Sequence, residues 1–480
     1  MHRDFEACYR AISSRDPRFD GRFVTGVVTT GIYCRPVCPA PLPRRENVRF
    51  HPTAAAAARA GLRPCRRCRP DRAPAGPPVP GGSPEVRRAL RMIDAGFLDG
   101  NPVSALAAAT HLSERQLRRA FAAELGATPR DIARARRAHL ARVLLEASGA
   151  PVAEVALAAG YRSLRRFNAE VRATFGAPPR ALRRGRAAGG PASGHLALRI
   201  AYRPPLDMEA LLGFLAPRAV AGVEEVVGGV YRRVAGTAAG PRVVTLRPEP
   251  ARRAVVLEAP ADAHAEVAAL AARARRLLDL DADPLAVAEA LGADPLLGPR
   301  VRVRPGLRVP GAWDPFEGAV RAVLGQQVSV AAATGLAGRL AARAGAPLAA
   351  PDGGLRRAFP DPAAVAAADL DRLGLTAGRA RALRTLAERV RDGALVLDPA
   401  RDPADVREEL LAIPGVGPWT ADYVALRALR DPDAFPDGDL GVRRALGDGD
   451  GPCTAAAARE RAAAWRPWRA YATLHLWTGG

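Results

Sequence analysis

The sequence predicts a multidomain α+β chain with four parts: a small cysteine-bearing head, an all-α middle, a small α+β domain and an all-α C-terminal domain. A length of 480 residues is too great for one core, because domains usually have about 100–200 residues. The stretches Pro70 to Pro84 and Gly185 to Gly194 are rich in Pro and Gly and are predicted to be linkers. Residues 196–305 mix short strand-like runs (HLALRIAY, PRVVTLRP, RAVVLEAP) with helical ones, and the sequence from about residue 306 onward is helical in pattern. The predicted domains are residues 1–72, 84–184, 195–305 and 306–480.

The charge is unevenly distributed along the chain. The formal net charge is +22, and all 71 basic residues are Arg. Residues 1–190 carry 34 Arg against 15 acidic residues, whereas residues 191–480 carry 37 against 34. An Arg-rich proteome explains the Arg content but not this asymmetry. A strongly basic half-chain attracts polyanions by counterion release, so nucleic acid is the expected partner.

The composition also indicates in which cellular compartment the protein acts. No run of about 18 apolar residues is present, so no membrane partner is expected. The start, MHRDFEACYRAISSRDPRFD, has no apolar signal segment. Six cysteines, four of them closely grouped, fit a reducing cytoplasm better than a disulfide scaffold. We expect a bacterial cytoplasmic protein associated with the nucleoid.

Four cysteines form two close pairs in the head. Cys34 and Cys38 form C-x3-C, and Cys65 and Cys68 form C-x2-C after a gap of 26 residues. Pairs with this spacing can converge on one tetrahedral Zn²⁺. A purely structural zinc is the alternative to a reactive one. Reactivity is favoured because zinc keeps a ligand thiol ionised, and six arginines nearby would attract a phosphate backbone; they are Arg35, Arg44, Arg45, Arg66, Arg67 and Arg69.

The segments VVTTGIYCRPVCPAPLPRRENVRF and AGLRPCRRCRP resemble the N-terminal domain of the Ada adaptive-response regulator family over roughly residues 1–72. The resemblance implies that Cys34 irreversibly accepts a methyl group from a DNA methylphosphotriester, with Cys38, Cys65 and Cys68 as its zinc co-ligands. Methylation makes the ligand a neutral thioether, and the family uses this loss of charge to tighten promoter binding. Cys8 and Cys453 lie outside the pattern and are expected to be packing residues.

The helical middle repeats one pattern. PVSALAAATHLSERQLRRAFAAEL (102–125) and PVAEVALAAGYRSLRRFNAEVRATF (151–175) each predict a short helix, a turn and an Arg-bearing helix after a Ser N-cap. Ser113 with Gln116 predicts a capping box. One copy alone could be a plain α-hairpin. Two copies joined by a helix from Asp131 to Ala147, and followed by FGAPPRAL, resemble the AraC-type DNA-binding domain with its double helix-turn-helix. The candidate groove-facing residues are Arg115, Gln116, Arg119, Arg165, Arg166 and Asn168.

The stretch LLAIPGVGPWTADYVALRAL (410–429) predicts a helix-hairpin-helix. One helix is expected to end at Ala412 and the next to begin at Trp419. Gly415 and Gly417 would let backbone N–H groups approach a DNA phosphate at a helix N-terminus. A tight helix–helix turn without DNA is the alternative.

The hairpin followed by AFPDGDLGVRRAL (434–446) resembles the helix-hairpin-helix glycosylase superfamily. AVRAVLGQQVSVAAATGLAGRL and WRPWRAYATLHLWTG extend the resemblance to the AlkA-type 3-methyladenine glycosylases over about residues 196–480. It implies that Asp439 is the catalytic aspartate, with Asp437 as its neighbouring rival. It also implies that Trp419, Tyr423 and Trp477 line the base pocket, where electron-rich rings stack on electron-poor alkylated purines. Core packing is the alternative for these aromatic residues.

Three features refine this resemblance. Bifunctional members carry a Lys where this chain has Trp419, and the sequence contains no Lys, so a monofunctional glycosylase is predicted. The AlkA-type residue that wedges into the emptied base stack is apolar, whereas Gln327 stands at this position. The Pro-Cys-His-Arg active site of a methylguanine methyltransferase, the usual partner of the Ada head, is absent from the sequence.

The sequence therefore predicts a fusion of methylphosphotriester sensor, AraC-type regulator and alkylbase glycosylase. The alternative is a transcription regulator whose C-terminal half binds DNA without catalysis. One Zn²⁺ is the expected cofactor. The expected partners are double-stranded DNA, both damaged and at promoters, with RNA polymerase as a candidate protein partner.

Overall fold

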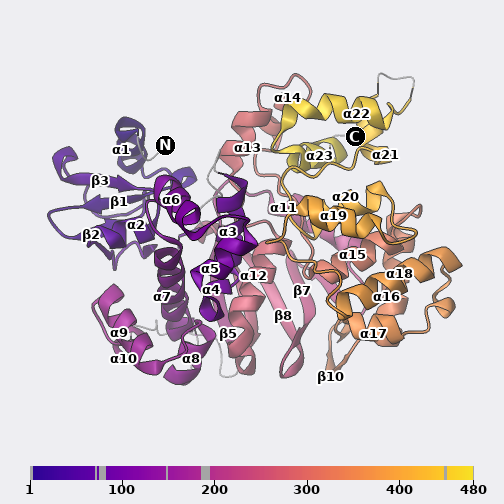
Figure 1. The fold of residues 1–480 in the computed structure, drawn as a ribbon, viewed down its shortest axis with the longest axis horizontal. Helices are drawn as coiled ribbons and strands as arrows, with labels where there is room; N and C mark the ends of the chain where they lie inside the picture. Colours follow the sequence, from indigo (N-terminus) through magenta and orange to yellow (C-terminus); the bar gives the residue numbers. More distant parts are fainter. Residues whose placement is uncertain are drawn as a thin grey trace. The chain divides into compact units, whose positions relative to one another are not determined.

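The computed structural model describes residues 4–70, 73–74, 83–147, 150–184, 195–447 and 451–478 (Figure 1). The predicted linker Gly185 to Gly194, and most of the linker Pro70 to Pro84, lie outside the described residues. The chain forms two compact units. Unit 1 comprises Met1–Pro204, Glu249–Ala272 and Leu280–Ala282; unit 2 comprises Pro205–Pro248, Arg273–Asp279 and Asp283–Gly480.

The head, in unit 1, is a small sheet with two helices. The sheet has the order β3-β1-β2-β4. Its elements are α1 (Phe5–Ser14), β1 (Val24–Val27), β2 (Ile32–Cys34), β3 (Val48–His51), α2 (Ala54–Arg59) and β4 (Arg63–Pro64). Asp4 caps α1 by accepting from the N–H of Ala7, and the buried face of α1 packs on Phe23. Cys8 is fully buried in this core, as expected for a packing residue.

The helical middle, also in unit 1, is built from two matching halves. Its helices are α3 (Pro84–Asp94), α4 (Phe97–Gly100), α5 (Val103–Ala109), α6 (Glu114–Leu125), α7 (Pro129–Ala147), α8 (Val152–Ala158), α9 (Leu164–Phe175) and α10 (Pro179–Arg184). Helices α6 and α9 both have 12 residues, begin after a capping Ser and end at a Gly in the left-handed conformation. The predicted capping box of Ser113 and Gln116 is confirmed. In Figure 1, α7 runs from α6 to the second half.

Polar contacts join the head to the middle within unit 1. The hydroxyl of Thr53 donates to the carbonyl of Leu125 over 3.0 Å. Arg69, next to a zinc-pattern cysteine, pairs with Glu146 of α7 at 2.8 Å. Both partners of this ion pair are less than a fifth exposed. The cysteine-bearing loop is therefore held against the helix that connects the two helix-turn-helix halves.

The three strand-like runs of the sequence are strands. They are β5 (His195–Ala201), β8 (Gly240–Glu249) and β9 (Ala254–Pro260). In unit 1, β5 pairs antiparallel with β9. In unit 2, β8 belongs to an antiparallel meander with β6 (Glu224–Val227) and β7 (Val230–Thr237), two strands that the sequence did not predict. Charged residues in EEVV and VYRRVAGT hid these strands, because Glu224 and Arg233 are buried as ion-paired residues.

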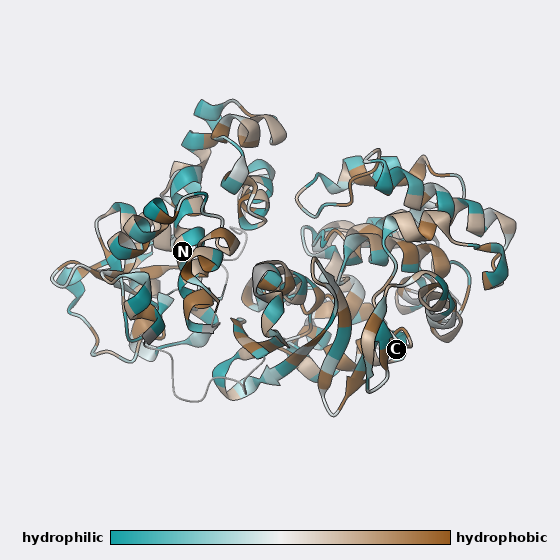
Figure 2. Cartoon of the chain, turned by 90° about the horizontal axis from the view of Figure 1, so that it is seen from below, coloured by the Kyte–Doolittle hydropathy of each residue, from teal (hydrophilic) through white to brown (hydrophobic). Residues whose placement is uncertain are grey.

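The remainder of unit 2 is mainly helical. Its helices are α11 (Met208–Leu215), α13 (Pro284–Leu291), α14 (Leu297–Val303), α15 (Pro315–Leu324), α16 (Val330–Ala344), α17 (Pro362–Ala367), α18 (Ala377–Arg391), α19 (Pro403–Leu411), α20 (Pro418–Arg427), α21 (Leu440–Ala445), α22 (Ala455–Ala462) and α23 (Arg469–Trp477). A further helix, α12 (Val267–Leu277), contains the boundary between the units at Ala272. Many of these helices carry both hydrophobic and hydrophilic residues, as amphipathic helices packed around a core do (Figure 2).

Two details differ from the sequence-based expectation. The predicted all-α region also contains a short hairpin of β10 (Pro347–Asp352) and β11 (Leu355–Arg357), with Leu355 buried against Val234 of β7. The helix expected to begin at Trp419 begins one residue earlier, because Pro418 is favoured in the first turn, where no N–H bond is lost.

Candidate functional site

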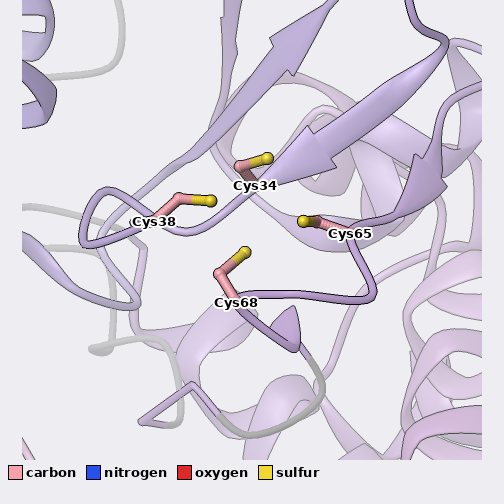
Figure 3. Close-up of side chains that lie close together, drawn as sticks. All are labelled: Cys34, Cys38, Cys65 and Cys68. Carbon is pink, nitrogen blue, oxygen red and sulfur yellow. The ribbon is translucent and has the colours of Figure 1, made fainter. Parts of the chain in front are cut away.

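The four cysteines of the head converge because of strand pairing. β2 and β4 are parallel, with Tyr33 opposite Pro64, so both strands end at the same edge of the sheet. Cys34 is the last residue of β2, and Cys65 directly follows β4. Cys38 and Cys68 follow in tight turns, and Figure 3 shows all four sulfurs pointing toward one centre.

The donor set fits Zn²⁺. The four sulfur atoms lie within 4.8 Å of one another. Tetrahedral zinc with bonds of about 2.3 Å holds its sulfur ligands about 3.8 Å apart. The four sulfur atoms therefore need to move only slightly closer together to bind zinc. Without a cation, four thiolates this close repel one another. Hydrogen bonds with Cys38 and Cys68, together with burial, raise the pKa of Cys34, while hydrogen bonds from Cys34 and Cys68 lower the pKa of Cys38 to about 2.

The arginines around this centre divide into two groups. Arg35, Arg45 and Arg69 form ion pairs with Asp20, Glu6 and Glu146. Arg35 also donates from its backbone N–H to the sulfur of Cys68 over 3.3 Å. Arg44, Arg66 and Arg67 are exposed. The second group therefore provides the more accessible positive charge near the sulfurs.

The candidate groove-facing residues lie on the exposed faces of two helices. Arg115, Gln116 and Arg119 are exposed on α6; Arg165, Arg166 and Asn168 are exposed on α9. Two of these side chains already have partners. The amide of Gln116 accepts from Ser113 as part of the capping box, and Arg166 pairs with Glu170 at 3.0 Å.

A cavity of about 790 Å³ lies within unit 2. Its wall includes Trp419 and Tyr423 of α20 and Trp477 of α23, the three aromatic residues selected from the sequence. The rings of Trp419 and Tyr423 are stacked, with centroids 5.1 Å apart, and Trp477 lies 6.3 Å from Tyr423. All three rings keep part of their surface exposed, so they line the cavity rather than fill a closed core.

Asp439 lies in the wall of the same cavity. It caps the N-terminus of α21 and accepts the N–H of Val442 over 3.1 Å. Its two carboxylate oxygens also accept from the indole N–H groups of Trp419 (3.0 Å) and Trp477 (2.9 Å). Asp437, the rival candidate, instead pairs with Arg459 at 2.6 Å and is not part of the cavity wall.

The helix-hairpin-helix is formed by α19 and α20. Gly415 adopts a left-handed conformation (φ +91°), and a Cβ there would lie 3.2 Å from the Cβ of Ala382. Gly417 caps α20 without a side chain, which leaves the helix N-terminus open to a phosphate.

The loop before α16 carries Gln327, which is exposed and has a positive φ of 53°. Its neighbour Gln326 donates to the carbonyl of Gly415 over 2.8 Å and to Thr420 over 3.0 Å. This contact ties the Gln327 loop to the hairpin.

Four residues of this region were not predicted from the sequence. Gln326 joins the two loops, and Phe214, Arg218 and Arg427 line the cavity. Phe214 and Arg218 lie in and just after α11, about 200 residues before α20, and no local pattern links the two segments. Arg427 is four residues after Tyr423 and therefore on the same face of α20, which is the one signal that could have indicated it.

Four known domain families match the chain in succession. They are the metal binding domain of Ada (residues 7–71), a helix-turn-helix domain (106–185), the AlkA N-terminal domain (197–314) and the HhH-GPD superfamily of base excision DNA repair proteins (320–469). The first match and the cysteine cluster together establish a site for one Zn²⁺ in the head.

A protein of Mycobacterium tuberculosis (strain H37Rv), the probable bifunctional transcriptional activator/DNA repair enzyme AlkA, is 47% identical over 484 residues, covering 100% of this chain and 97% of the relative. The chain belongs to this bifunctional activator and DNA repair family. It is therefore a DNA-binding protein, and its C-terminal half is a DNA glycosylase domain.

Other relatives match one half each. DNA-3-methyladenine glycosylase 2 of Escherichia coli (strain K12) is 40% identical over 280 residues, 58% of this chain and 95% of the relative. The bifunctional transcriptional activator/DNA repair enzyme Ada of the same organism is 36% identical over 37% of this chain and 48% of its own length. A solved 3-methyladenine DNA glycosylase from Archaeoglobus fulgidus superposes with a TM-score of 0.52 at 25% identity, covering 58% of this chain and 96% of that structure.

None of the helices among the described residues is long and apolar enough to cross a membrane.

The zinc site predicts a specific metal dependence. The purified chain should contain one equivalent of zinc, and Cys65→Ser should lower zinc affinity at least about tenfold, because a buried ligand is lost. Competition with a chromogenic chelator measures both values. Cys453→Ser, outside the cluster, is the control; an unchanged affinity in Cys65→Ser would contradict the assignment.

The hairpin predicts a cost for a side chain at Gly415. Gly415→Ala should weaken binding to undamaged duplex DNA roughly fivefold, since a left-handed Ala costs about 1 kcal/mol and the added Cβ crowds Ala382. Fluorescence anisotropy measures the dissociation constant. Gly335→Ala, on a helix with room for the methyl group, should bind like the wild type; equal affinity of both variants would rule out a role for the hairpin conformation.

Proposed function

We propose that this chain excises alkylated purines of the 3-methyladenine type by hydrolysing their N-glycosidic bond, with Asp439 as the catalytic carboxylate. The observation that carries this proposal is the position of Asp439 in the wall of an aromatic cavity, where two indoles fix both carboxylate oxygens. The names of the relatives from M. tuberculosis and E. coli support the same activity.

The residues suggest how the reaction proceeds. A flipped alkylpurine stacks on the rings of Trp419, Tyr423 and Trp477, which favour electron-poor bases. The glycosidic bond breaks with its electron pair on the base, and positive charge develops on the sugar. The carboxylate of Asp439 stabilises that charge and orients the attacking water. The chain has no Lys for a Schiff base, so the enzyme is a monofunctional glycosylase.

For the DNA-binding step, we propose that the backbone N–H groups of Gly415 and Gly417 donate hydrogen bonds to a phosphate of the DNA backbone. Gln327 fills the space that the flipped base leaves, and its exposed position and its tether through Gln326 support this role. In unit 1, Arg115, Gln116, Arg119, Arg165, Arg166 and Asn168 provide the surfaces that α6 and α9 present to the major groove.

We propose further that Cys34 accepts a methyl group from a DNA methylphosphotriester. Cys65 and Cys68 are buried, and Cys68 accepts a hydrogen bond that lowers the nucleophilicity of its sulfur. Cys34 and Cys38 are more exposed, and the backbone N–H of Ala40 hydrogen-bonds to the sulfur of Cys38. Bound zinc keeps the thiolates ionised at neutral pH. The S–C bond forms as the C–O bond of the triester breaks, and the phosphate leaves as a diester anion.

The two halves then act as one damage response. Methylation removes one negative charge from the head. Because Arg69 lies next to the ligand Cys68 and pairs with Glu146 of α7, this loss of charge changes the contact between the head and α7. The four functional segments that we propose are residues 1–72, 84–184, 195–305 and 306–480. The activator name of the relatives supports RNA polymerase as the protein partner at promoters.

Substitution of the carboxylate tests the glycosylase. Asp439→Asn should slow release of 3-methyladenine from methylated DNA by roughly 100-fold or more, because a neutral amide does not stabilise the developing sugar cation. Single-turnover base release measured by chromatography gives the rate. Asp437→Asn, whose side chain pairs with Arg459 outside the cavity, should keep near-normal activity. Equal rates for wild type and Asp439→Asn would exclude catalysis by this residue and favour a non-catalytic DNA-binding half.

The acceptor role has an independent test. Incubation with methylphosphotriester DNA should add about 14 Da to the peptide that contains Cys34, and Cys34→Ser should remove this adduct. The same variant should retain base release, since the glycosylase cavity lies in the other unit. Peptide mass spectrometry reads the adduct, with Cys453→Ser as the control. An adduct on Cys38, or none, would refute the assignment to Cys34.

A further inference from the structure

Residues 325–329 form the loop between α15 and α16, and this loop borders the cavity. Val328 lies in the cavity wall, as does Val330, the first residue of α16. Gln327 precedes them, is exposed and has a positive φ of 53°. This left-handed conformation is costly for a side chain other than Asn or Asp, so the surrounding contacts must maintain it.

Gln326 makes the contacts that hold the loop. Its side-chain amide donates to the carbonyl of Gly415 over 2.8 Å and to the hydroxyl of Thr420 over 3.0 Å. Its backbone carbonyl accepts from the guanidinium of Arg379 over 2.5 Å. That carbonyl belongs to the peptide bond between Gln326 and Gln327. Arg379 therefore fixes the peptide plane that precedes the strained residue.

The backbone of Arg379 is fixed by a helix cap. It lies in the first turn of α18, where its N–H donates to the hydroxyl of Thr376 over 3.4 Å. Its side chain is half-buried, and no carboxylate among the described residues forms an ion pair with it. An ion pair would stabilise the fold whether or not the loop were in place. The guanidinium instead makes a charge-assisted hydrogen bond to the loop, and such bonds are stronger than neutral ones.

Helix α18 also packs against the hairpin. A Cβ on Gly415 would lie 3.2 Å from the Cβ of Ala382 and 3.6 Å from the carbonyl oxygen of Gly378. The loop, the hairpin and α18 therefore contact one another in all three pairs. A hairpin that binds a phosphate thus sets the position of Gln327 relative to the DNA backbone.

We infer that Arg379 is a positioning residue, which holds Gln327 in the conformation that fills the space of a flipped base. This inference rests on the role proposed above for Gln327. Arg379 is not part of the cavity wall, so it acts through the loop and not on the base.

The benefit of a preformed loop depends on the cost of opening the target base pair. A paired base loses its pairing and stacking when it flips, whereas an unpaired base leaves the stack at lower cost. Loss of Arg379 should therefore slow excision from a paired site more than from an unpaired one. A residue needed only for folding would slow both equally.

Arg379→Met tests the inference, because Met keeps an apolar side chain and removes the guanidinium. The substrates are duplexes with a single 7-methylguanine opposite either cytosine or an abasic-site analogue. With saturating enzyme, single-turnover release opposite cytosine should fall about tenfold, since small displacements of a positioned group are costly. Release opposite the analogue should stay within about twofold of wild type. Arg379→Lys should recover part of the lost rate, and Arg381→Met, exposed on the same helix, is the control and should change neither rate.

A double-mutant cycle shows whether Arg379 acts through Gln327. Gln327→Ala should slow release opposite cytosine, and the combination with Arg379→Met should be no slower than the slower single variant. Fully additive effects would overturn the inference, as would an equal fall on both duplexes or an unchanged rate opposite cytosine in Arg379→Met.

Two further outcomes separate this inference from the proposals on which it rests. A wild-type rate for Gln327→Ala opposite cytosine would overturn the role proposed for Gln327, and with it this inference, while leaving the glycosylase proposal intact. Release from neither duplex by the wild type would overturn the proposed glycosylase activity itself.

Discussion

The carboxylate of Asp439 accepts hydrogen bonds from the indoles of Trp419 and Trp477, and these two contacts join the helices α20, α21 and α23. Trp419 is the second residue of α20, Asp439 caps α21, and Trp477 ends α23. A carboxylate that must stabilise a transient sugar cation has to be fixed before the charge appears. In the mechanism that we propose, the faces of the same indoles stack on the base, so base binding and charge stabilisation depend on one set of contacts.

The head depends on a different constraint, the convergence of four cysteine sulfurs on one cation. The methyl transfer that we propose for the head needs an anionic, soft sulfur, and four sulfurs within 4.8 Å can be ionised together only around a cation. The parallel register of β2 and β4 brings Cys34 and Cys65 to one edge, and turns bring the other two cysteines to the same point. The glycosylase wall, by contrast, contains the guanidiniums of Arg218 and Arg427 as well as the carboxylate of Asp439. The head therefore concentrates negative charge at one point, whereas the glycosylase wall combines acidic and basic side chains.

Local patterns in the sequence were enough to predict the cysteine cluster, the Ser113 capping box, the hairpin glycines and three of the strands. Each was indicated by a short motif whose spacing is visible in the chain, although the two cysteine pairs meet only because β2 pairs with β4. The contacts that complete the cavity are not local: Phe214 and Arg218 reach Trp477 and Tyr423 only through the tertiary fold. Strands β6 and β7 were not predicted, because Glu and Arg side chains are usually exposed. Here Glu224 and Arg233 form an ion pair, and this pairing allows both side chains to be buried.

We propose that one chain combines a single-use thiolate acceptor with a catalytic glycosylase. The most direct measurement incubates the purified full chain with two separate duplexes, one with a methylphosphotriester and one with 3-methyladenine, and follows both products in one time course. Methyl transfer should saturate at one equivalent per chain, while released base continues to accumulate over many turnovers. Base release that stops at one equivalent, or methyl transfer that exceeds one, would contradict the account.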